Sequence, residues 1–128
     1  MNRAIMNVKI TNVFNNEGLK KPLKFKKGHG NSFLIDINGE KLLFDAGDSS
    51  RKLLKNLKLL DVSPDEISKA ILSHGHYDHT RGLIGFVGEL DDEKILDVYA
   101  HPNIMEIKGA GNPDGEVPNI GFPDINKK

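Results

Sequence analysis

The chain contains no cysteine, and no hydrophobic run approaches the ~18 residues that a membrane-spanning helix needs. The lack of cysteine excludes a disulfide scaffold, zinc bound through thiolates and a thiol nucleophile. The first ten residues lack the apolar segment of a signal peptide, so the expected location is the cytoplasm, with no membrane partner. Lys and Arg together number 18, as do Asp and Glu, which gives a net charge of zero. A neutral chain argues against binding dominated by nucleic acid or an anionic membrane.

Length and periodicity indicate one small domain of the α/β or layered α+β class. The 128 residues are 38% hydrophobic, which is enough for one modest core. Alternating apolar residues predict strands, and a leucine stripe over residues 53–60 predicts a helix that Asp48 or Ser49 caps. Asn38-Gly39 is a strong signal for a two-residue hairpin. The expected order is strand, hairpin, helix, strand, helix and strand, over residues 6–14, 32–44, 50–60, 70–73, 83–90 and 95–100.

Three histidines and an aspartate fall within six residues, in the string His74-Gly75-His76-Tyr77-Asp78-His79. They follow an apolar strand and precede a helix, and α/β proteins bind ligands at such strand ends. Residues two apart in an extended segment point the same way, so His74 and His76 can share one metal ion. Asp78 and His79 can face a second ion. Imidazole and carboxylate ligands suit zinc, iron or manganese, and four such side chains in six residues favour a metal site over a merely solvated loop.

The pattern His-x-His-x-Asp-His is the signature of the metallo-β-lactamase superfamily, which this chain resembles. Residues 31–35 and 43–47 are similar to the first strand pair of that family and to its Asp-x-Gly turn. Residues 72–80, 101–102 and 120–123 resemble one subgroup, which contains the archaeal dihydropterin–ribofuranosylaminobenzene phosphate synthases of methanopterin biosynthesis. The resemblance implies one mixed sheet with two to three helices, forming the N-terminal half of an αββα sandwich.

The same resemblance implies roles for individual residues. His74 and His76 would bind the first metal ion, and Asp78 and His79 the second. Asp45 would brace the metal-binding loop from behind the ligands. In the hydrolases of the family a hydroxide between the two metals is the nucleophile, and Asp78 would be the catalytic residue that orients it.

Three further residues are candidates for substrate contact. Arg81 stands where the family usually has glycine and could hold a substrate phosphate, although a solvated arginine is the favoured alternative. His29 lies between glycines, where an ordinary loop histidine is favoured. His101 ends a strand on the side where active sites form. The lysines in residues 20–27 are expected to form a solvated loop rather than a nucleic-acid site, since Phe25 is the one aromatic residue among them.

The chain resembles only the first half of the family fold. Residues 109–128 show no periodicity, so we expect a truncated single domain with a structured part over residues 1–108 and an irregular tail. The second half normally supplies two more histidines and a bridging aspartate, and no residue after His79 lies in a matching motif. Each metal would keep two side-chain ligands, and one apolar sheet face would lie uncovered.

Three functions therefore stay open. The first is a dinuclear metal-dependent hydrolase or transferase, completed by a second chain or a second copy, that acts on a small, phosphorylated substrate. In the subgroup, this reaction couples a dihydropterin diphosphate to an aromatic amine with loss of diphosphate. The second is a non-catalytic half-domain that binds a metal or another ligand. The third is a truncated remnant without activity.

We expect the 128-residue chain alone to bind zinc weakly, because water must fill the metal positions that two side chains leave open. His76→Ala should remove most of that binding, since it leaves one side chain on the first metal. Isothermal calorimetry with added zinc measures both effects. Tight binding of two metal ions by the purified monomer would contradict the expectation.

Overall fold

The computed structural model describes residues 6–17 and 24–105. The expected tail, residues 109–128, and the subgroup motif at residues 120–123 lie outside these residues. The described part has the elements β1 (Val8–Phe14), β2 (Ser32–Ile37), β3 (Glu40–Phe44), α1 (Ser50–Leu59), η1 (Pro64–Glu66), β4 (Ile67–Ile71), α2 (Tyr77–Gly88), β5 (Asp97–Tyr99) and η2 (Pro102–Met105), where η marks a short 3-10 helix. No helix of this part is long and apolar enough to cross a membrane.

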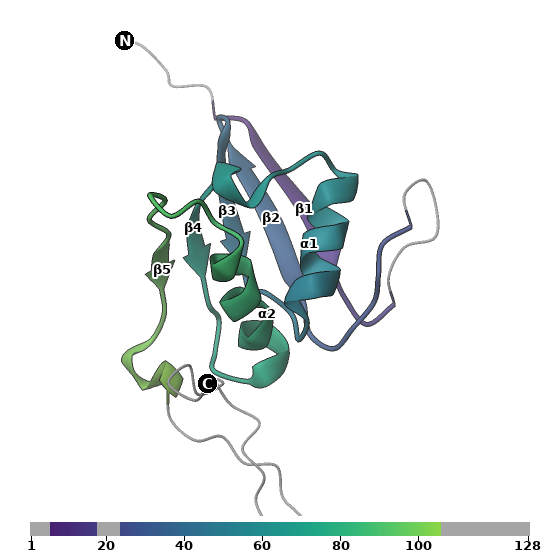
Figure 1. Ribbon diagram of the computed structural model, residues 1–128, viewed down its shortest axis with the longest axis vertical. Helices are drawn as coiled ribbons and strands as arrows, with labels where there is room; N and C mark the ends of the chain where they lie inside the picture. The colour runs from purple at the N-terminus through teal and green to yellow at the C-terminus, as the bar shows by residue number, and fades with distance from the viewer. Residues whose placement is uncertain (1–5, 18–23, 106–128) are drawn as a thin grey trace, which may run out of the picture.

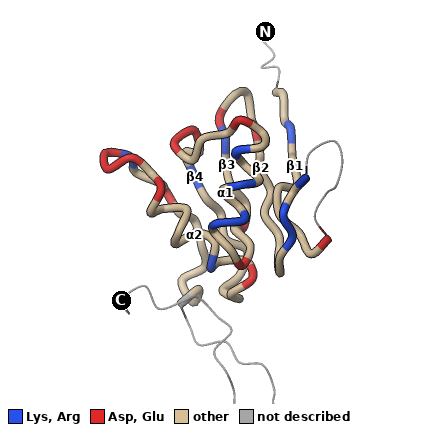
Figure 2. Tube along the Cα trace, turned by 45° about the vertical axis from the view of Figure 1, so that its right-hand side comes forward, with Lys and Arg blue, Asp and Glu red and all other residues tan. Residues whose placement is uncertain are grey.

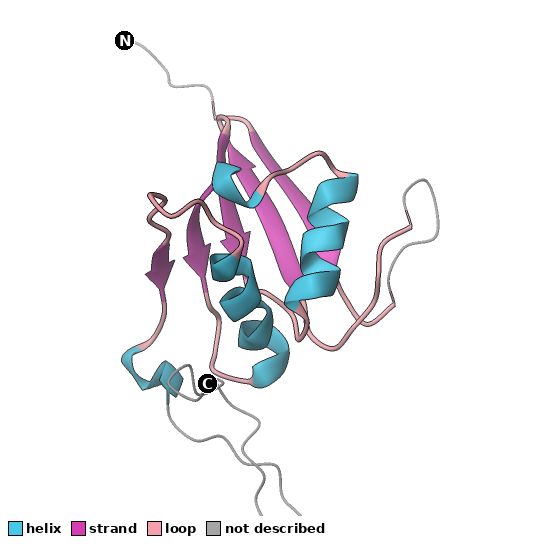
Figure 3. Cartoon of the chain, in the orientation of Figure 1, coloured by secondary structure: helices cyan, strands magenta, loops and turns pink. Residues whose placement is uncertain are grey.

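The five strands form one mixed sheet in the order β1-β2-β3-β4-β5. The pairs β1–β2 and β2–β3 are antiparallel, whereas β3–β4 and β4–β5 are parallel. Both helices lie on the same face of this sheet (Figure 1, Figure 3). The structure thus confirms the prediction of an α/β domain with one mixed sheet and two helices.

Local sequence signals account for the turn and the helix start that position these elements. Asn38 and Gly39 take φ values of 51° and 90°, the left-handed pair that a tight hairpin between β2 and β3 requires. The carboxylate of Asp36 accepts the N–H of Gly39 at 2.8 Å. Ser49 rather than Asp48 caps α1, because its hydroxyl accepts the N–H of Lys52 at 3.3 Å.

Two element boundaries differ from the sequence prediction. Strand β4 covers residues 67–71 rather than 70–73, and α2 begins at Tyr77 rather than at residue 83. Glycine lowers helix propensity, and Gly82, Gly85 and Gly88 all fall within this helix. In the fold, however, a Cβ on Gly82 would collide with the carbonyl of Ala46, and one on Gly85 would collide with Ser50. Close packing of α2 on these segments therefore overrides its weak helix propensity.

The two faces of the sheet differ sharply in burial. On the helix side, Leu34 and Leu43 are paired neighbours, and they are 7% and 0% exposed. On the other side, their sequence neighbours Ile35 and Leu42 are only partly buried, and Ile10 beside Ile35 is 63% exposed. No element of the described residues covers this second face. An apolar sheet face of this kind is typical of a surface that packs against another layer.

A buried asparagine ties the segment before β2 to α1. Asn56 is fully buried, and its side-chain amide donates to the carbonyls of Val13 and Lys26 at 2.8 and 2.9 Å. Its carbonyl oxygen accepts the N–H of Lys26 at 2.7 Å. A polar group in the core is tolerated because its hydrogen-bonding capacity is satisfied in this way. Asn56 thereby fixes the backbone at residue 26 against the helix.

We expect Asn56→Ala to lower the free energy of unfolding by about 2–3 kcal/mol, because it leaves three buried backbone groups without partners and opens a small cavity. Urea unfolding followed by circular dichroism measures the change. Lys55→Ala, on the exposed side of the same helix, is the matched control and should shift stability by no more than about 0.5 kcal/mol. Equal stability of the Asn56 variant and the control would contradict the assignment.

Candidate metal centre

The candidate site lies at the C-terminal edge of the parallel pair β3–β4. Phe44 and Ile71 are paired neighbours at the ends of these strands, so the residues that follow each strand meet at one edge. The N–H of Asp45 donates to the carbonyl of Ile71 at 2.8 Å. The backbone of Asp45 is left-handed, with φ of 57°, a conformation that aspartate adopts more readily than most residues. This turn directs the Asp45 carboxylate toward the start of the loop after β4.

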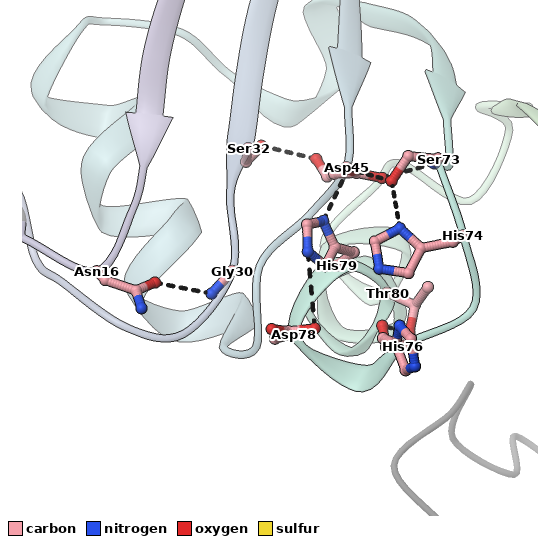
Figure 4. A network of polar contacts seen from close by, with 10 residues as sticks. All are labelled: Asn16, Gly30, Ser32, Asp45, Ser73, His74, His76, Asp78, His79 and Thr80. Carbon is pink, nitrogen blue, oxygen red and sulfur yellow. Dashed lines mark hydrogen bonds and ion pairs between the residues drawn. The ribbon is translucent and has the colours of Figure 1, made fainter. Parts of the chain in front are cut away.

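The Asp45 carboxylate, 3% exposed, is the centre of a hydrogen-bond network (Figure 4). Its Oδ1 accepts the N–H of Ser73 at 2.8 Å. Its Oδ2 accepts the hydroxyl of Ser73 at 2.6 Å and lies 2.8 Å from Nδ1 of His79. The hydroxyl of Ser32, fully buried, donates to the Asp45 carbonyl at 2.7 Å. Asp45 thus joins the end of β3 to the loop after β4 and to the first turn of α2.

Proton counting along this network fixes how the two histidines are presented. An ionised carboxylate only accepts, so Nδ1 of His79 carries a proton and donates it to Asp45. The one hydroxyl proton of Ser73 also goes to Asp45. Nδ1 of His74, 2.8 Å from Ser73 Oγ, must then donate to that oxygen. In its neutral form each imidazole then keeps a free lone pair on Nε2, which is the arrangement found where a carboxylate orients a metal-binding histidine.

His74, Asp78 and His79 come together in a group whose potential ligand atoms lie within 4.8 Å of one another. The rings of His74 and His79 have centroids 4.2 Å apart, and Nε2 of His79 lies 3.7 Å from Oδ1 of Asp78. Two atoms that share one ion at about 2.1 Å each are at most about 4.2 Å apart. The pair formed by Asp78 and His79 already meets this limit. The donor types suit a divalent cation, and this pair has the spacing that a shared ion requires.

His76 is adjacent to this group but is not one of its three members. It precedes the first residue of α2, and its carbonyl accepts the N–H of His79 and the hydroxyl of Thr80, each at 3.0 Å. Its ring meets that of His74 edge-on, with centroids 4.8 Å apart. The backbone of His76 therefore positions the first turn of α2, and its ring contacts that of His74.

The electrostatics favour the neutral form of one ligand. Burial lowers the pKa of His74 below its ordinary value, and the neighbouring rings of His79 and His76 lower it further. Asp45 and Asp78 oppose this shift without reversing it. A neutral imidazole is the form that binds a metal ion.

The three candidate substrate contacts lie in different surroundings. His101 shares a hollow of about 230 Å³ with Ser73 and His74. Arg81 is exposed and holds its guanidinium 4.9 Å over the ring of Tyr77. His29 lines a separate hollow of about 310 Å³, together with Lys27, Asp48 and Lys52 among others.

Sequence reasoning missed two contributors to this site. The sequence motif includes Ser73 but gives it no role of its own. In the structure, the Ser73 hydroxyl links the Asp45 carboxylate to Nδ1 of His74. The available signal is its position directly before the first histidine. Gly30, with φ of 91°, lies so close to Asp78 that a Cβ would collide with the Asp78 carbonyl. The side chain of Asn16 holds the N–H of Gly30 at 3.0 Å (Figure 4). No local sequence pattern predicts that Gly30 contacts both Asn16 and Asp78.

A mixed sheet with both helices on one face and a His/Asp cluster at its parallel edge defines the metallo-β-lactamase fold class. The sequence model of the metallo-beta-lactamase superfamily matches residues 26–121. The chain therefore belongs to this superfamily. The solved structure of the metallo-beta-lactamase MIM-1 from Novosphingobium pentaromativorans is similar in fold, with a TM-score of 0.53 and 19% identity, over 76% of this chain and 36% of that one.

Relatives with assigned names are similar to the same part of the chain. The 7,8-dihydropterin-6-methyl-4-(beta-D-ribofuranosyl)-aminobenzene-5'-phosphate synthase of Methanocaldococcus jannaschii is 42% identical over 94 residues, which cover 70% of this chain and 31% of that protein. Exodeoxyribonuclease WalJ of Streptococcus pneumoniae is 32% identical over 84 residues, which cover 66% and 30%. The match thus spans about a third of the length of each relative.

We expect Asp45→Ala to lower the free energy of unfolding by about 3 kcal/mol, because two donors of Ser73 and one of His79 lose a buried, charged acceptor. Asp45→Asn should cost less, since asparagine keeps one acceptor oxygen and tolerates the left-handed backbone. Urea unfolding ranks the two variants. Asp92→Ala, at an exposed aspartate, is the control and should change stability by no more than about 0.5 kcal/mol. A cost for Asp45→Ala as small as the control would show that the network does not stabilise the fold.

Proposed function

We propose that this chain is the metal-binding half of a dinuclear metal-dependent enzyme that acts on a small, phosphorylated substrate. One observation carries the proposal: Asp45 and Ser73 hold Nδ1 of His79 and of His74, in a cluster where potential ligand atoms of both histidines and of Asp78 lie within 4.8 Å of one another. The similarity to the M. jannaschii synthase supports a synthase of that type. The resemblance to its subgroup implies a transfer reaction that joins a dihydropterin diphosphate to an aromatic amine with loss of diphosphate. Superfamily membership supports metal-dependent chemistry in general.

The proposed ligands are His74 and His76 for one divalent ion and Asp78 and His79 for a second. Imidazole and carboxylate donors suit zinc, and they also bind iron or manganese. Ions held here would act as Lewis acids toward the oxygens of a phosphate or diphosphate group.

The chain's own residues would orient the reacting groups. Asp78 is partly buried in the first turn of α2. As the catalytic residue, it would accept a hydrogen bond from the attacking group and hold it in line with the phosphorus or carbon under attack. His101, across the hollow that it shares with His74, would contact the substrate. Arg81 and His29 are more remote candidates for this role.

A second polypeptide layer would complete the site. Among residues 6–17 and 24–105, one group of three potential ligands comes together, fewer than two ions require. The half-buried sheet face, where the rings of Phe33 and Phe44 lie 6.5 Å apart, would pack against that layer. We propose a second chain, or a second copy, as its source. The small ligand group also favours the alternative function, a half-domain that binds a metal ion without catalysis.

The test is an assay of the purified chain with zinc or manganese and a dihydropterin diphosphate together with its amine partner. We expect little or no turnover by the chain alone, because the pocket has one wall and the metals lack ligands. Turnover should appear when a chain carrying the second half is added. His74→Ala, Asp78→Ala and His79→Ala should each abolish it.

His29→Ala is the matched control, since His29 lines a different hollow and should leave metal binding unchanged. Zinc binding that survives in all three ligand variants would contradict the proposed centre. Robust turnover by the unaided chain would contradict the need for a second layer. Metal binding without turnover, with or without the second half, would favour the non-catalytic alternative.

A further inference from the structure

Six lysines gather on one surface around α1, although they come from two separate segments. Helix α1 contributes three of them at intervals of three residues, and the segment before β2 contributes the others. We call this surface the lysine face; its members are Lys24, Lys26, Lys27, Lys52, Lys55 and Lys58. Two hollows, each lined by lysines of both segments, show that the segments lie side by side. Lys27 lines one of about 310 Å³ with Lys52, and Lys24 and Lys26 line one of about 480 Å³ with Lys55 and Lys58.

The juxtaposition is built into the core rather than left to flexible side chains. The fully buried Asn56 holds both the N–H and the carbonyl of Lys26, at 2.7 and 2.9 Å. A second contact, from the N–H of Gly28 to the carbonyl of Asn15 at 3.1 Å, fixes the other end of the segment. The backbone that carries the lysines is therefore anchored along the helix, while their side chains reach solvent.

The positive charge of the lysine face is not compensated within the described residues. None of the six lysines forms an ion pair with a described carboxylate. Like charges three residues apart on a helix destabilise it, and α1 carries no acidic residue in its first turn to offset this. Asp48 does line the smaller hollow, but its Oδ1 is buried and lies outside hydrogen-bond range of both lysines there.

One cluster of acidic residues lies away from the lysine face, so the net charge of zero does not mean that the charges are evenly spread. Glu89, Asp91, Asp92, Glu93 and Asp97 fall within nine residues between α2 and β5. Figure 2 shows this red segment at one side of the molecule, with further red patches elsewhere, and shows blue on α1 and on the chain beside β1 among other places. The expectation that a neutral chain binds no polyanion rested on the sum of the charges. The arrangement of the charges weakens that expectation.

The lysine face carries more positive charge per unit length than one strand of a duplex carries negative charge. Helix α1 has ten residues and is about 15 Å long, so six lysines along it give one positive charge per about 2.5 Å. One strand of a nucleic-acid duplex carries one negative charge per about 3.4 Å along its axis. A linear polyanion could thus be neutralised along the whole helix.

We propose that the lysine face binds the phosphodiester backbone of a nucleic acid, independently of the proposed metal chemistry. The hollows favour a strand over a lipid bilayer, because a flat membrane surface cannot enter them. Exposed aromatic side chains for base stacking are scarce here, with only a half-buried Phe25 in the segment. Recognition would therefore be of the backbone and insensitive to sequence.

The test measures binding of the full 128-residue chain to fluorescein-labelled 12-nucleotide RNA and DNA, each single-stranded and as a duplex, by fluorescence anisotropy. EDTA in the buffer removes metal-dependent binding, so failure of the metal proposal does not affect the result. We expect K55Q/K58Q to bind about tenfold more weakly than the unmodified chain near 0.1 M salt. The slope of log Kd against log salt concentration should fall by roughly 1.4 for a single strand, since two phosphate contacts are lost.

K9Q/K94Q is the matched control, because it removes the same charge from lysines outside the lysine face and should leave binding unchanged. Urea midpoints of both double variants verify folding. Equal weakening by the two double variants would overturn the proposal, as would a polyglutamate peptide of equal charge that competes as well as the oligonucleotide. Binding to phosphatidylcholine–phosphatidylglycerol vesicles without binding to any oligonucleotide would also overturn it. The relative affinities for the four oligonucleotides, two single-stranded and two duplex, would show which nucleic acid supplies the backbone.

Discussion

One buried carboxylate sets the geometry of the candidate metal centre. Asp45 accepts three hydrogen bonds from two residues of the histidine loop, and its own backbone is held by the end of β4. A charge in a nearly solvent-free position is stable only when its oxygens are satisfied in this manner. The position of Ser73, and through it that of His74, follows from that requirement. The hydrogen bonds of Asp45 therefore tie the histidine loop to the end of β3.

Close backbone packing adds a second constraint at the same edge of the sheet. The N–H of Gly82 donates to the carbonyl of Gly47 at 3.0 Å, which draws α2 against the turn after β3. Gly30 packs against Asp78 from the opposite side. Any side chain at either glycine would push α2 away and move Asp78 and His79 with it. The first turn of α2 is thus clamped between two loops, and a clamped ligand loop is what a pre-formed metal site needs.

The sequence alone predicted most of the fold, because the strands and α1 have strong local signals such as Asn38-Gly39 and Ser49. It also identified the histidine motif and the Asp45 turn, since each is a contiguous pattern. It misplaced the start of α2 because the benefit of Gly82 comes from packing on Ala46, a contact that no local pattern encodes. It missed the hydrogen bonds of Ser73 and of Asn56 for the same reason, because the tertiary fold determines which groups a polar side chain contacts.

The lysine face shows how composition can mislead when charges are segregated. Lysines before β2 look like a solvated loop, and those of α1 look like the outer side of an amphipathic helix; each interpretation is sound for its own segment. Asn56 changes the conclusion, because it lays one segment on the other and brings six positive charges together. Their mutual repulsion opposes folding, and the fold retains them without a described acidic partner. Because the core holds these like charges together, binding of an external anion explains their arrangement better than solvation alone.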